Sequence, residues 1–327
     1  MKKFLIIRFS SIGDIVLTTP VIRSIRKRYP QSEIHYFTKA SFQQVLQHNP
    51  YIDRLHLLKN DLSTQLAALK KERYDYVIDL HNNLRSLRVK WTLGRPHVAF
   101  HKENWQKYLM VRFKKRLQLS HIVDRYGETL NAIDASLDGE GLDFFLPEGL
   151  EEQAREEIAK HQIPPEDCLA VILGATYQTK RWLSTHFIEL LNAYQQPIIL
   201  LGGPDAIKEA SFISSELSIP HLNAVGKHNL LMSAAMMKAC RAVLTHDTGF
   251  MHIAAAFGQR VYSIWGNTVP EFGMTPYQTK HTILEVKDLA CRPCSKIGFH
   301  QCPKGHFRCM TQLSPAQVLQ GLEDLLA

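Results

Sequence analysis

The chain has 327 residues, of which 45% are hydrophobic and 21% charged, and its formal net charge is +8. It can bury a sizeable core and exceeds the usual size of one α/β unit, so two domains are expected. No run approaches the roughly 20 apolar residues of a membrane-spanning helix, and the apolar start, interrupted by Arg8, is too short for a secretory signal. We therefore expect a cytoplasmic protein.

Positive charge is concentrated in one stretch of the chain. Ten Lys or Arg residues lie between His81 and Arg116, against one acid, Glu103, so the remainder is nearly neutral. Such a patch suits a phosphate- or carboxylate-rich partner or an anionic membrane surface. An ordinary solvated face is the alternative. Within this stretch, Arg85 and Arg88 are the candidates for contact with an anionic ligand.

The first half of the chain alternates apolar runs with helical patterns, which is typical of a parallel sheet covered by helices on both faces. The predicted strands are residues 4–9, 33–37 and 76–80, and the predicted helices are residues 15–28 and 42–48. Glycines and prolines between Asp138 and Pro165 surround one acidic helical stretch, residues 151–161, and indicate a linker. The expected domains are residues 1–160 and 161–327.

The second half repeats this alternation. Strands are expected at residues 169–173, 197–201, 242–245 and 261–264, and helices at residues 185–194, 205–217, 249–257 and 314–326. The predicted fold class is α/β, with two Rossmann-like, doubly wound parallel-sheet domains facing a central cleft. Ligands of such sheets bind outside the carboxyl ends of the strands.

Asp14 follows the first predicted strand, in the segment Ser-Ser-Ile-Gly-Asp at the start of a helix. Its carboxylate could cap that helix, or it could take a proton from an acceptor hydroxyl in the cleft. The segment is not G-x-G-x-x-G, so a nicotinamide dehydrogenase has no fingerprint here.

Two further segments follow strands of the second half. Lys180 and Arg181 come after residues 169–173, where adjacent cations suit a diphosphate group. Asp247, Thr248 and Gly249 come after residues 242–245 and open a helix, which predicts an anion seat lined by backbone amides. Asp247 could instead be only a helix cap.

Together these segments resemble glycosyltransferase family 9, the ADP-heptose:lipopolysaccharide heptosyltransferases. The resemblance is carried by RFSSIGDIVLTTP, TKRW with the following HFIEL, LLGGPD, and HDTGFMHIAAAFG leading into YSIWGNTVP. It spans nearly the whole chain in the right order. The Asp-Thr-Gly-x-x-His-x-Ala-Ala-Ala block is its most specific part.

The resemblance implies a GT-B fold in which residues 1–160 bind the acceptor and residues 161–327 bind the donor. It implies inverting transfer of heptose, or a related sugar, from an ADP-sugar to a lipopolysaccharide core or similar lipid-linked anionic saccharide. Peripheral contact with the inner face of the cytoplasmic membrane is expected, and no cofactor is required. Asp14 matches the general base. The implied donor-binding residues are Thr176, Lys180, Arg181, His228, Asp247, Thr248, Gly249 and His252.

Four of the six cysteines lie in the segment 291–309, with the spacing C-x2-C-x7-C-x6-C: Cys291, Cys294, Cys302 and Cys309. Four thiolates can hold one structural zinc ion, although the second pair lacks the close spacing of paired knuckles. Disulfides are disfavoured in a reducing compartment. We interpret the segment as structural or peripheral and not as catalytic.

Two other interpretations stay open. One is a GT-B transferase that uses another nucleotide or a hexose donor. The other is a zinc-containing nucleic-acid-binding protein, suggested by the basic stretch and the cysteines. The sequence lacks a recognised RNA or DNA motif, so no nucleic-acid partner is expected.

Overall fold

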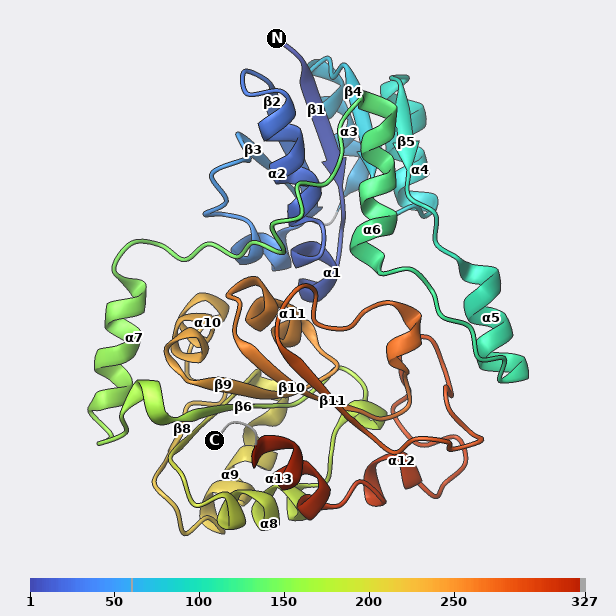
Figure 1. Ribbon diagram of the computed structural model, residues 1–327. Coiled ribbons are helices and arrows are strands. Elements are labelled where there is room, and N and C mark those ends of the chain that lie inside the picture. The colour runs from blue at the N-terminus through green and yellow to red at the C-terminus, as the bar shows by residue number, and fades with distance from the viewer. Residues whose placement is uncertain (60, 324–327) are drawn as a thin grey trace. The chain divides into compact units, whose positions relative to one another are not determined.

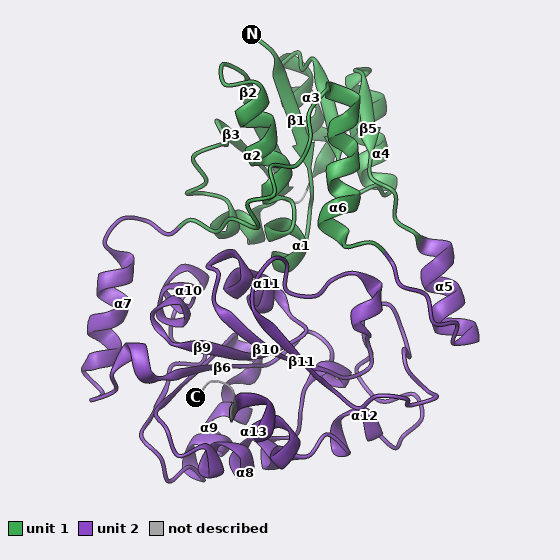
Figure 2. Cartoon of the chain, in the orientation of Figure 1, with its two compact units in different colours: residues 1–103, 120–145 green, residues 104–119, 146–327 purple. Residues whose placement is uncertain are grey.

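The computed structural model describes residues 1–59 and 61–323, and the chain divides into two compact units (Figures 1 and 2). The first unit consists of Met1–Glu103 and Ser120–Phe145, and the second of Asn104–Leu119 and Leu146–Ala327. The expected division after residue 160 therefore moves to residue 145. The reason is that helix α7 (Leu150–Ala159) packs on α10 (Leu230–Ala239), where Glu151 pairs with Lys238 at 2.5 Å.

The first unit is built on a five-stranded parallel sheet with the order β3-β2-β1-β4-β5. Its strands are β1 (Lys3–Ile7), β2 (Glu33–Lys39), β3 (Arg54–Leu58), β4 (Tyr76–Asp79) and β5 (His97–Ala99). Its helices are α1 (Ile12–Val16), α2 (Thr19–Arg28), α3 (Leu62–Lys71), α4 (Leu84–Leu93) and α6 (Ile122–Gly127). The last four residues of β1 are buried, as a central strand covered on both faces requires.

Two helix predictions in this unit are wrong in detail. Residues 15–28 form two helices instead of one, because the hydroxyl of Thr18 bonds the carbonyl of Ile15 at the end of α1, and Pro20 then stands in the first turn of α2. Residues 42–48 are not an α-helix, since a 3-10 helix occupies Ala40–Val45.

The second unit is built on a six-stranded parallel sheet with the order β11-β10-β9-β6-β7-β8. Its strands are β6 (Leu169–Leu173), β7 (Ile198–Gly202), β8 (His221–Asn223), β9 (Ala242–His246), β10 (Arg260–Trp265) and β11 (His281–Glu285). Besides α7 and α10, its helices are α5 (Asn104–Phe113), α8 (Ser184–Tyr194), α9 (Ile207–Ser215), α11 (Gly249–Ala256), α12 (Arg308–Thr311) and α13 (Pro315–Glu323).

Helices cover both faces of this sheet. Figure 1 shows α8, α9 and α13 on one face and α10 and α11 on the other. Val171 and Leu200 belong to the core that includes residues of α8, α9 and α13. The alternate residues Ala170 and Ile199 point to the opposite face and are also fully buried. Trp182 belongs to the first core, and its ring N–H donates to the carbonyl of Leu313 at 3.1 Å. The tryptophan of the TKRW block is therefore structural.

The C-terminal helix begins where the sequence predicts. The Ser314 hydroxyl accepts a hydrogen bond from the N–H of Gln317, and the Gln317 side chain accepts one from the N–H of Ser314. The last three residues of the predicted helix, 324–326, lie outside the described residues. Within the described ranges, no helix combines the length and the apolar character that crossing a bilayer requires.

The strand orders determine where ligands can bind. In the first sheet the chain adds β2 and β3 on one side of β1 and then β4 and β5 on the other side. In the second sheet it adds β7 and β8 on one side of β6 and then β9, β10 and β11 on the other side. Ligands of open parallel sheets bind at this reversal point, beyond the carboxyl ends of the strands. Asp14 follows β1, Lys180 follows β6 and Asp247 follows β9, so all three lie at such points.

Candidate functional site

Asp14 lies on α1, and its carboxylate has two partners. Oδ1 pairs with Nη2 of Arg8 at 2.7 Å, and Oδ2 accepts hydrogen bonds from the N–H and the hydroxyl of Ser11 at 3.1 and 2.8 Å. Burial opposes ionisation, but Arg8 and Ser11 outweigh it and hold the pKa of Asp14 below its ordinary value. The side chain is 25% exposed. Asp14 thus closes the first turn of α1 and also presents an ionised, partly accessible carboxylate.

Sequence patterns alone do not identify Arg8 as a functional residue. The one signal in the sequence is that Arg8 is a single cation within the apolar run of residues 4–9. It donates from Nε to the carbonyl of Ser10 and from Nη1 to the carbonyl of Leu80, both at 2.7 Å. Leu80 directly follows β4. Arg8 therefore fixes the Asp14 carboxylate relative to the ends of β1 and β4.

The two predicted acceptor residues line a hollow of about 350 Å³ in the first unit. Its lining consists of three leucines and four cations: Leu58, Leu62, Leu84, Lys39, Lys59, Arg85 and Arg88. The Arg85 guanidinium lies 5.6 Å from the centre of the Phe9 ring, just beyond β1, and Arg88 donates to the Ser63 hydroxyl at 3.1 Å. A lining with four cations and no acid favours an anionic ligand.

The second unit brings two predicted residues together, Lys180 and Asp247, across the ends of neighbouring strands. Nζ of Lys180 lies 2.6 Å from Oδ2 of Asp247 and donates to the Asp247 carbonyl at 3.0 Å. The Thr268 hydroxyl, beyond β10, donates to the same carboxylate oxygen at 2.8 Å. The Lys180 and Asp247 side chains are 17% and 11% exposed, so the pair is largely buried yet reachable from solvent.

Arg181 makes a separate set of contacts, which tie the loop after β6 to the loop after β7. Nε and Nη2 both donate to the carbonyl of Ala175, at 3.0 and 2.7 Å, and Nη2 also pairs with the Asp205 carboxylate. This close approach requires Gly174, whose φ is +83° and whose added Cβ would lie 3.0 Å from Oδ2 of Asp205. Lys180 and Arg181, although adjacent in sequence, therefore have different partners. Contact of Arg181 with a donor stays a prediction.

The turn after Asp247 has the backbone form expected of an anion-binding site at a helix N-terminus. Thr248 is the extended N-cap residue of α11, and Gly249 is the first residue of the helix. The first N–H groups of an α-helix lack partners within it, so they are available to an anion at this end. His252 lies one turn further along and is 3% exposed.

The other two predicted donor residues lie in connections that follow β6 and β8. Thr176 is exposed in the loop after β6, and His228 lies in the connection between β8 and α10. Three strand spacings separate β8 from β9, which corresponds to about 14 Å along the sheet. Contact of Thr176 and His228 with a donor stays a prediction.

Buried polar residues that sequence patterns do not single out attach the cysteine-rich segment to this site. Thr179 and Asn267 are 2% and 1% exposed, and the Thr179 hydroxyl lies 3.1 Å from Oδ1 of Asn267. The N–H of Phe299 donates to the Thr179 hydroxyl at 2.8 Å, and the N–H of Cys294 donates to the Asn267 carbonyl at 2.9 Å. The segment thereby contacts the turn that holds Lys180 and the turn after β10 that holds Thr268, whose hydroxyl bonds Asp247.

The four clustered cysteines do not form a ready coordination site. Their thiols lie near enough to influence one another electrostatically, but no three of their sulfur atoms lie within 4.8 Å of one another. Burial raises the pKa of Cys294 to about 11 and that of Cys309 to about 12. Zinc binding by Cys291, Cys294, Cys302 and Cys309 stays a prediction.

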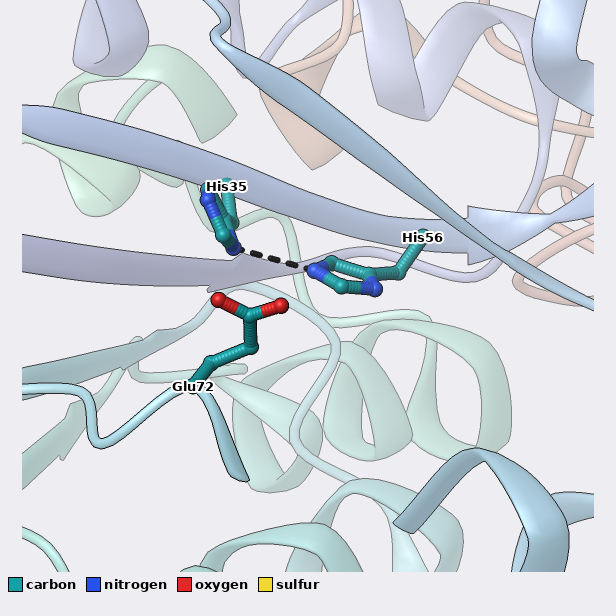
Figure 3. Close-up of side chains that lie close together, drawn as sticks. All are labelled: His35, His56 and Glu72. Atoms are coloured by element: carbon teal, nitrogen blue, oxygen red, sulfur yellow. Dashed lines mark hydrogen bonds between the residues drawn. The ribbon is translucent and has the colours of Figure 1, made fainter. Parts of the chain in front are cut away.

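Within residues 1–59 and 61–323, one group of potential metal ligands is close-packed: His35, His56 and Glu72 (Figure 3). Nδ1 of His35 lies 3.0 Å from Nε2 of His56, and the Tyr74 hydroxyl lies within 3.0 Å of both nitrogens. The Glu72 carboxylate pairs with Lys3, at 3.0 Å, and with Arg54. Because these protein partners already engage the ligand atoms, we interpret the group as a hydrogen-bonded network that joins the starts of the strands.

The buried His246 is expected to make the fold sensitive to acid. Burial lowers the pKa of His246 to about 4, and its Nε2 accepts the N–H of Trp182 at 3.0 Å. As the pH falls from about 6.5 to about 4, the unfolded chain binds a proton that the folded chain resists, so stability falls. We expect a loss on the order of 2–3 kcal/mol from this residue at pH 4.

Urea unfolding at several pH values tests this expectation. His246→Gln keeps an acceptor near the position of Nε2 but does not titrate. Its unfolding free energy should therefore decline less between pH 6.5 and 4.5 than that of the wild type. Equal declines in the two proteins would show that His246 is not the residue responsible.

Comparisons of the sequence with known proteins point to one family. The sequence model of glycosyltransferase family 9 (heptosyltransferase) matches residues 65–303. Lipopolysaccharide heptosyltransferase 1 of Pseudomonas aeruginosa is 25% identical over 364 residues, which covers 99% of this chain and 98% of that protein.

Solved structures confirm the predicted fold class. A family 9 glycosyltransferase from Veillonella parvula superimposes with a TM-score of 0.82 at 24% identity, covering 99% of this chain and 97% of that one. The ADP-heptose lipopolysaccharide heptosyltransferase II of Escherichia coli has a TM-score of 0.76 at 21% identity, covering 100% and 98%. The two parallel-sheet units therefore form a GT-B fold.

Proposed function

Because the chain belongs to glycosyltransferase family 9, the heptosyltransferase family, and is a glycosyltransferase, we propose that it transfers heptose or a related sugar from an ADP-sugar. The proposed acceptor is a lipopolysaccharide core or a similar lipid-linked anionic saccharide. The observation that carries the proposal is the Lys180–Asp247 pair at the start of α11, within the segment that the family model matches.

The second unit is the proposed donor-binding unit. The Lys180 ammonium is held by the carboxylate and the carbonyl of Asp247 and is 17% exposed, so a diphosphate arriving from solvent can reach it. The N-terminus of α11 adds backbone donors beside that cation. Charge develops on the leaving diphosphate as the sugar departs, and fixed donors and cations stabilise it most at that moment. An adenosine lying along the strand ends toward β8 would approach His228.

The first unit is the proposed acceptor-binding unit, and Asp14 is its proposed base. The carboxylate takes the proton of the acceptor hydroxyl as that oxygen bonds to the anomeric carbon. The bond between the anomeric carbon and the diphosphate breaks in the same displacement, and ADP leaves with the electron pair. One displacement inverts the anomeric configuration. The Arg8 pair weakens Asp14 as a base but keeps it ionised at neutral pH.

The acceptor is proposed to enter the hollow lined by Arg85 and Arg88, because its four cations suit phosphate or carboxylate groups. Because the proposed acceptor is lipid-linked, we propose that the transfer takes place at the cytoplasmic face of the inner membrane. We propose no cofactor for the transfer and no nucleic-acid partner. A zinc ion on the cysteines would be structural, since that segment contacts the turns that hold Lys180 and Thr268.

Nucleotide specificity provides the test. We expect ADP at saturating concentration to raise the melting temperature by several degrees, because a ligand at about 100 times its Kd stabilises the fold by about 2.7 kcal/mol. UDP and GDP at the same concentration should raise it much less. A larger shift with UDP or GDP would assign the site to a transferase with another donor.

A further inference from the structure

Helix α5 exposes an unusual set of aromatic side chains. Trp105, Tyr108 and Phe113 are 67%, 44% and 59% exposed. Their rings form a continuous chain, since Trp105 stacks on Tyr108 at 5.5 Å and Tyr108 meets Phe113 edge-on at 6.1 Å. Three linked aromatic rings in contact with solvent form an apolar patch of the kind that marks an interaction site.

The opposite face of α5 already anchors the helix to the second unit. Met110 and Leu119 are buried in a small core with Phe272, and Val111 and Leu117 pack against it. Lys296 reaches the Asn104 carbonyl and side-chain oxygens at 3.4 Å, which places the cysteine-rich segment beside the start of the helix. The outer rings are therefore not needed to hold α5 in place.

The same segment carries only positive charge. Residues 104–119 contain five cations, namely Lys107, Arg112, Lys114, Lys115 and Arg116, and no Asp or Glu. Arg116 pairs with Asp288, and Lys114 donates to the carbonyl of Pro293 at 2.6 Å. Arg112 and Lys115 are exposed, and the Arg112 guanidinium lies 5.7 Å from the centre of the Phe113 ring. We call Trp105, Tyr108, Phe113, Arg112 and Lys115 the α5 surface.

We propose that the α5 surface docks the protein on an anionic lipid bilayer, with the helix lying in the plane of the interface. This inference rests on the proposed function, because a lipid-linked acceptor is the reason for the protein to bind a membrane. Tryptophan and tyrosine favour the boundary between headgroups and acyl chains, and a basic face beside an apolar face is the pattern of helices that lie on membranes. Lys and Arg gain further attraction from anionic headgroups.

The residues beside α5 and the length of the helix are both compatible with binding to a lipid bilayer. Ile297, in the cysteine-rich segment next to Lys296, is 57% exposed and adds an apolar side chain close to the start of α5. A helix of ten residues is about 15 Å long, which suits the headgroup region but is far too short to span a bilayer. The positive charge also opposes docking of a second copy through the same surface.

Tryptophan fluorescence tests the contact directly. The chain has four tryptophans, of which Trp182 and Trp265 are buried and Trp91 and Trp105 exposed. In a Trp91→Phe background, Trp105 is the exposed reporter. Vesicles of phosphatidylglycerol and phosphatidylethanolamine should shift its emission to shorter wavelength, and acyl-chain-brominated lipid should quench it. Unchanged emission at saturating lipid would overturn the proposal.

Vesicle sedimentation tests which residues are responsible. Replacing Trp105, Tyr108 and Phe113 by serine should lower partitioning by about tenfold or more. Arg112→Gln with Lys115→Gln should weaken binding to phosphatidylglycerol vesicles and reduce its salt dependence. Phe212→Ser and Lys208→Gln are matched controls, because both residues are exposed on α9 of the same unit, and they should leave binding unchanged.

The outcomes separate this inference from the proposed function. The serine variant should retain wild-type turnover of a delipidated, water-soluble acceptor and lose activity only on acceptor embedded in vesicles. Wild-type partitioning of the serine variant would refute the α5 surface even if transfer were confirmed. Tighter binding of the α5 surface to an oligonucleotide than to vesicles, lost in the same variant, would also refute it and reassign the surface to nucleic acid.

Discussion

Asparagine in place of Asp14 is expected to lower kcat by about 10²- to 10⁴-fold while changing the affinity for ADP by less than about twofold. The reason is that the amide cannot take the acceptor proton, whereas the proposed donor contacts belong to the other unit. Arg8 keeps two carbonyl partners in the variant, the oxygens of Ser10 and Leu80, so the fold should persist. Single-turnover kinetics and calorimetry with ADP measure the two quantities.

Ser11→Ala is the matched control for this substitution. It removes the hydroxyl bond to Asp14, at 2.8 Å, but leaves the backbone bond and the Arg8 pair. Turnover should stay within a fewfold of the wild type. If Asp14→Asn lost ADP binding and turnover to the same extent, Asp14 would be a structural residue whose role is to close α1.

Methionine in place of Lys180 is expected to weaken ADP binding by about 10- to 100-fold, because it removes one charge-assisted contact with the diphosphate. The variant should also lose about 1–3 kcal/mol of unfolding free energy, since the largely buried Asp247 carboxylate would keep only the Thr268 hydroxyl as a side-chain donor. Calorimetry and urea unfolding measure these effects separately.

A double variant distinguishes donor binding from fold stability. Adding Asp247→Asn to Lys180→Met removes the unpaired charge, so stability should recover in part while ADP affinity stays low. Lys208→Met, an exposed lysine on α9, should change neither. Recovery of ADP affinity together with stability would mean that Lys180 acts on the fold and does not contact the diphosphate.

The fold was predictable where strands are central and helices amphipathic. Leu169–Leu173 matches its predicted bounds because five apolar residues stand between turn residues, as in a strand buried on both faces. The strands β3, β5, β8 and β11 were not predicted, since they lie at or near sheet edges, and two of them have only three residues. Helix α10 was missed because its buried alanines and methionines occur on all sides and give no helical period.

Sequence patterns point to residues of the candidate site but not to the contacts that those residues make. Small residues and charges after strands pointed to Asp14, Lys180 and Asp247, since loops at the carboxyl edge of a parallel sheet lie at its binding side. The sequence could not show that Lys180 faces Asp247 while Arg181 binds Asp205, because that depends on the paths of two loops. Nor could it show that Thr179 and Asn267 attach the cysteine-rich segment to the loops after β6 and β10.

The central claim, transfer of heptose from an ADP-sugar, is tested most directly by a donor screen with the purified protein. The acceptor is a delipidated saccharide core that lacks heptose, and mass spectrometry follows each of a panel of ADP-, UDP- and GDP-sugars. The product should gain one heptose residue with ADP-heptose, with release of ADP and an inverted anomeric configuration. Sugar transfer from a UDP- or GDP-sugar, with ADP-heptose left intact, would contradict the account.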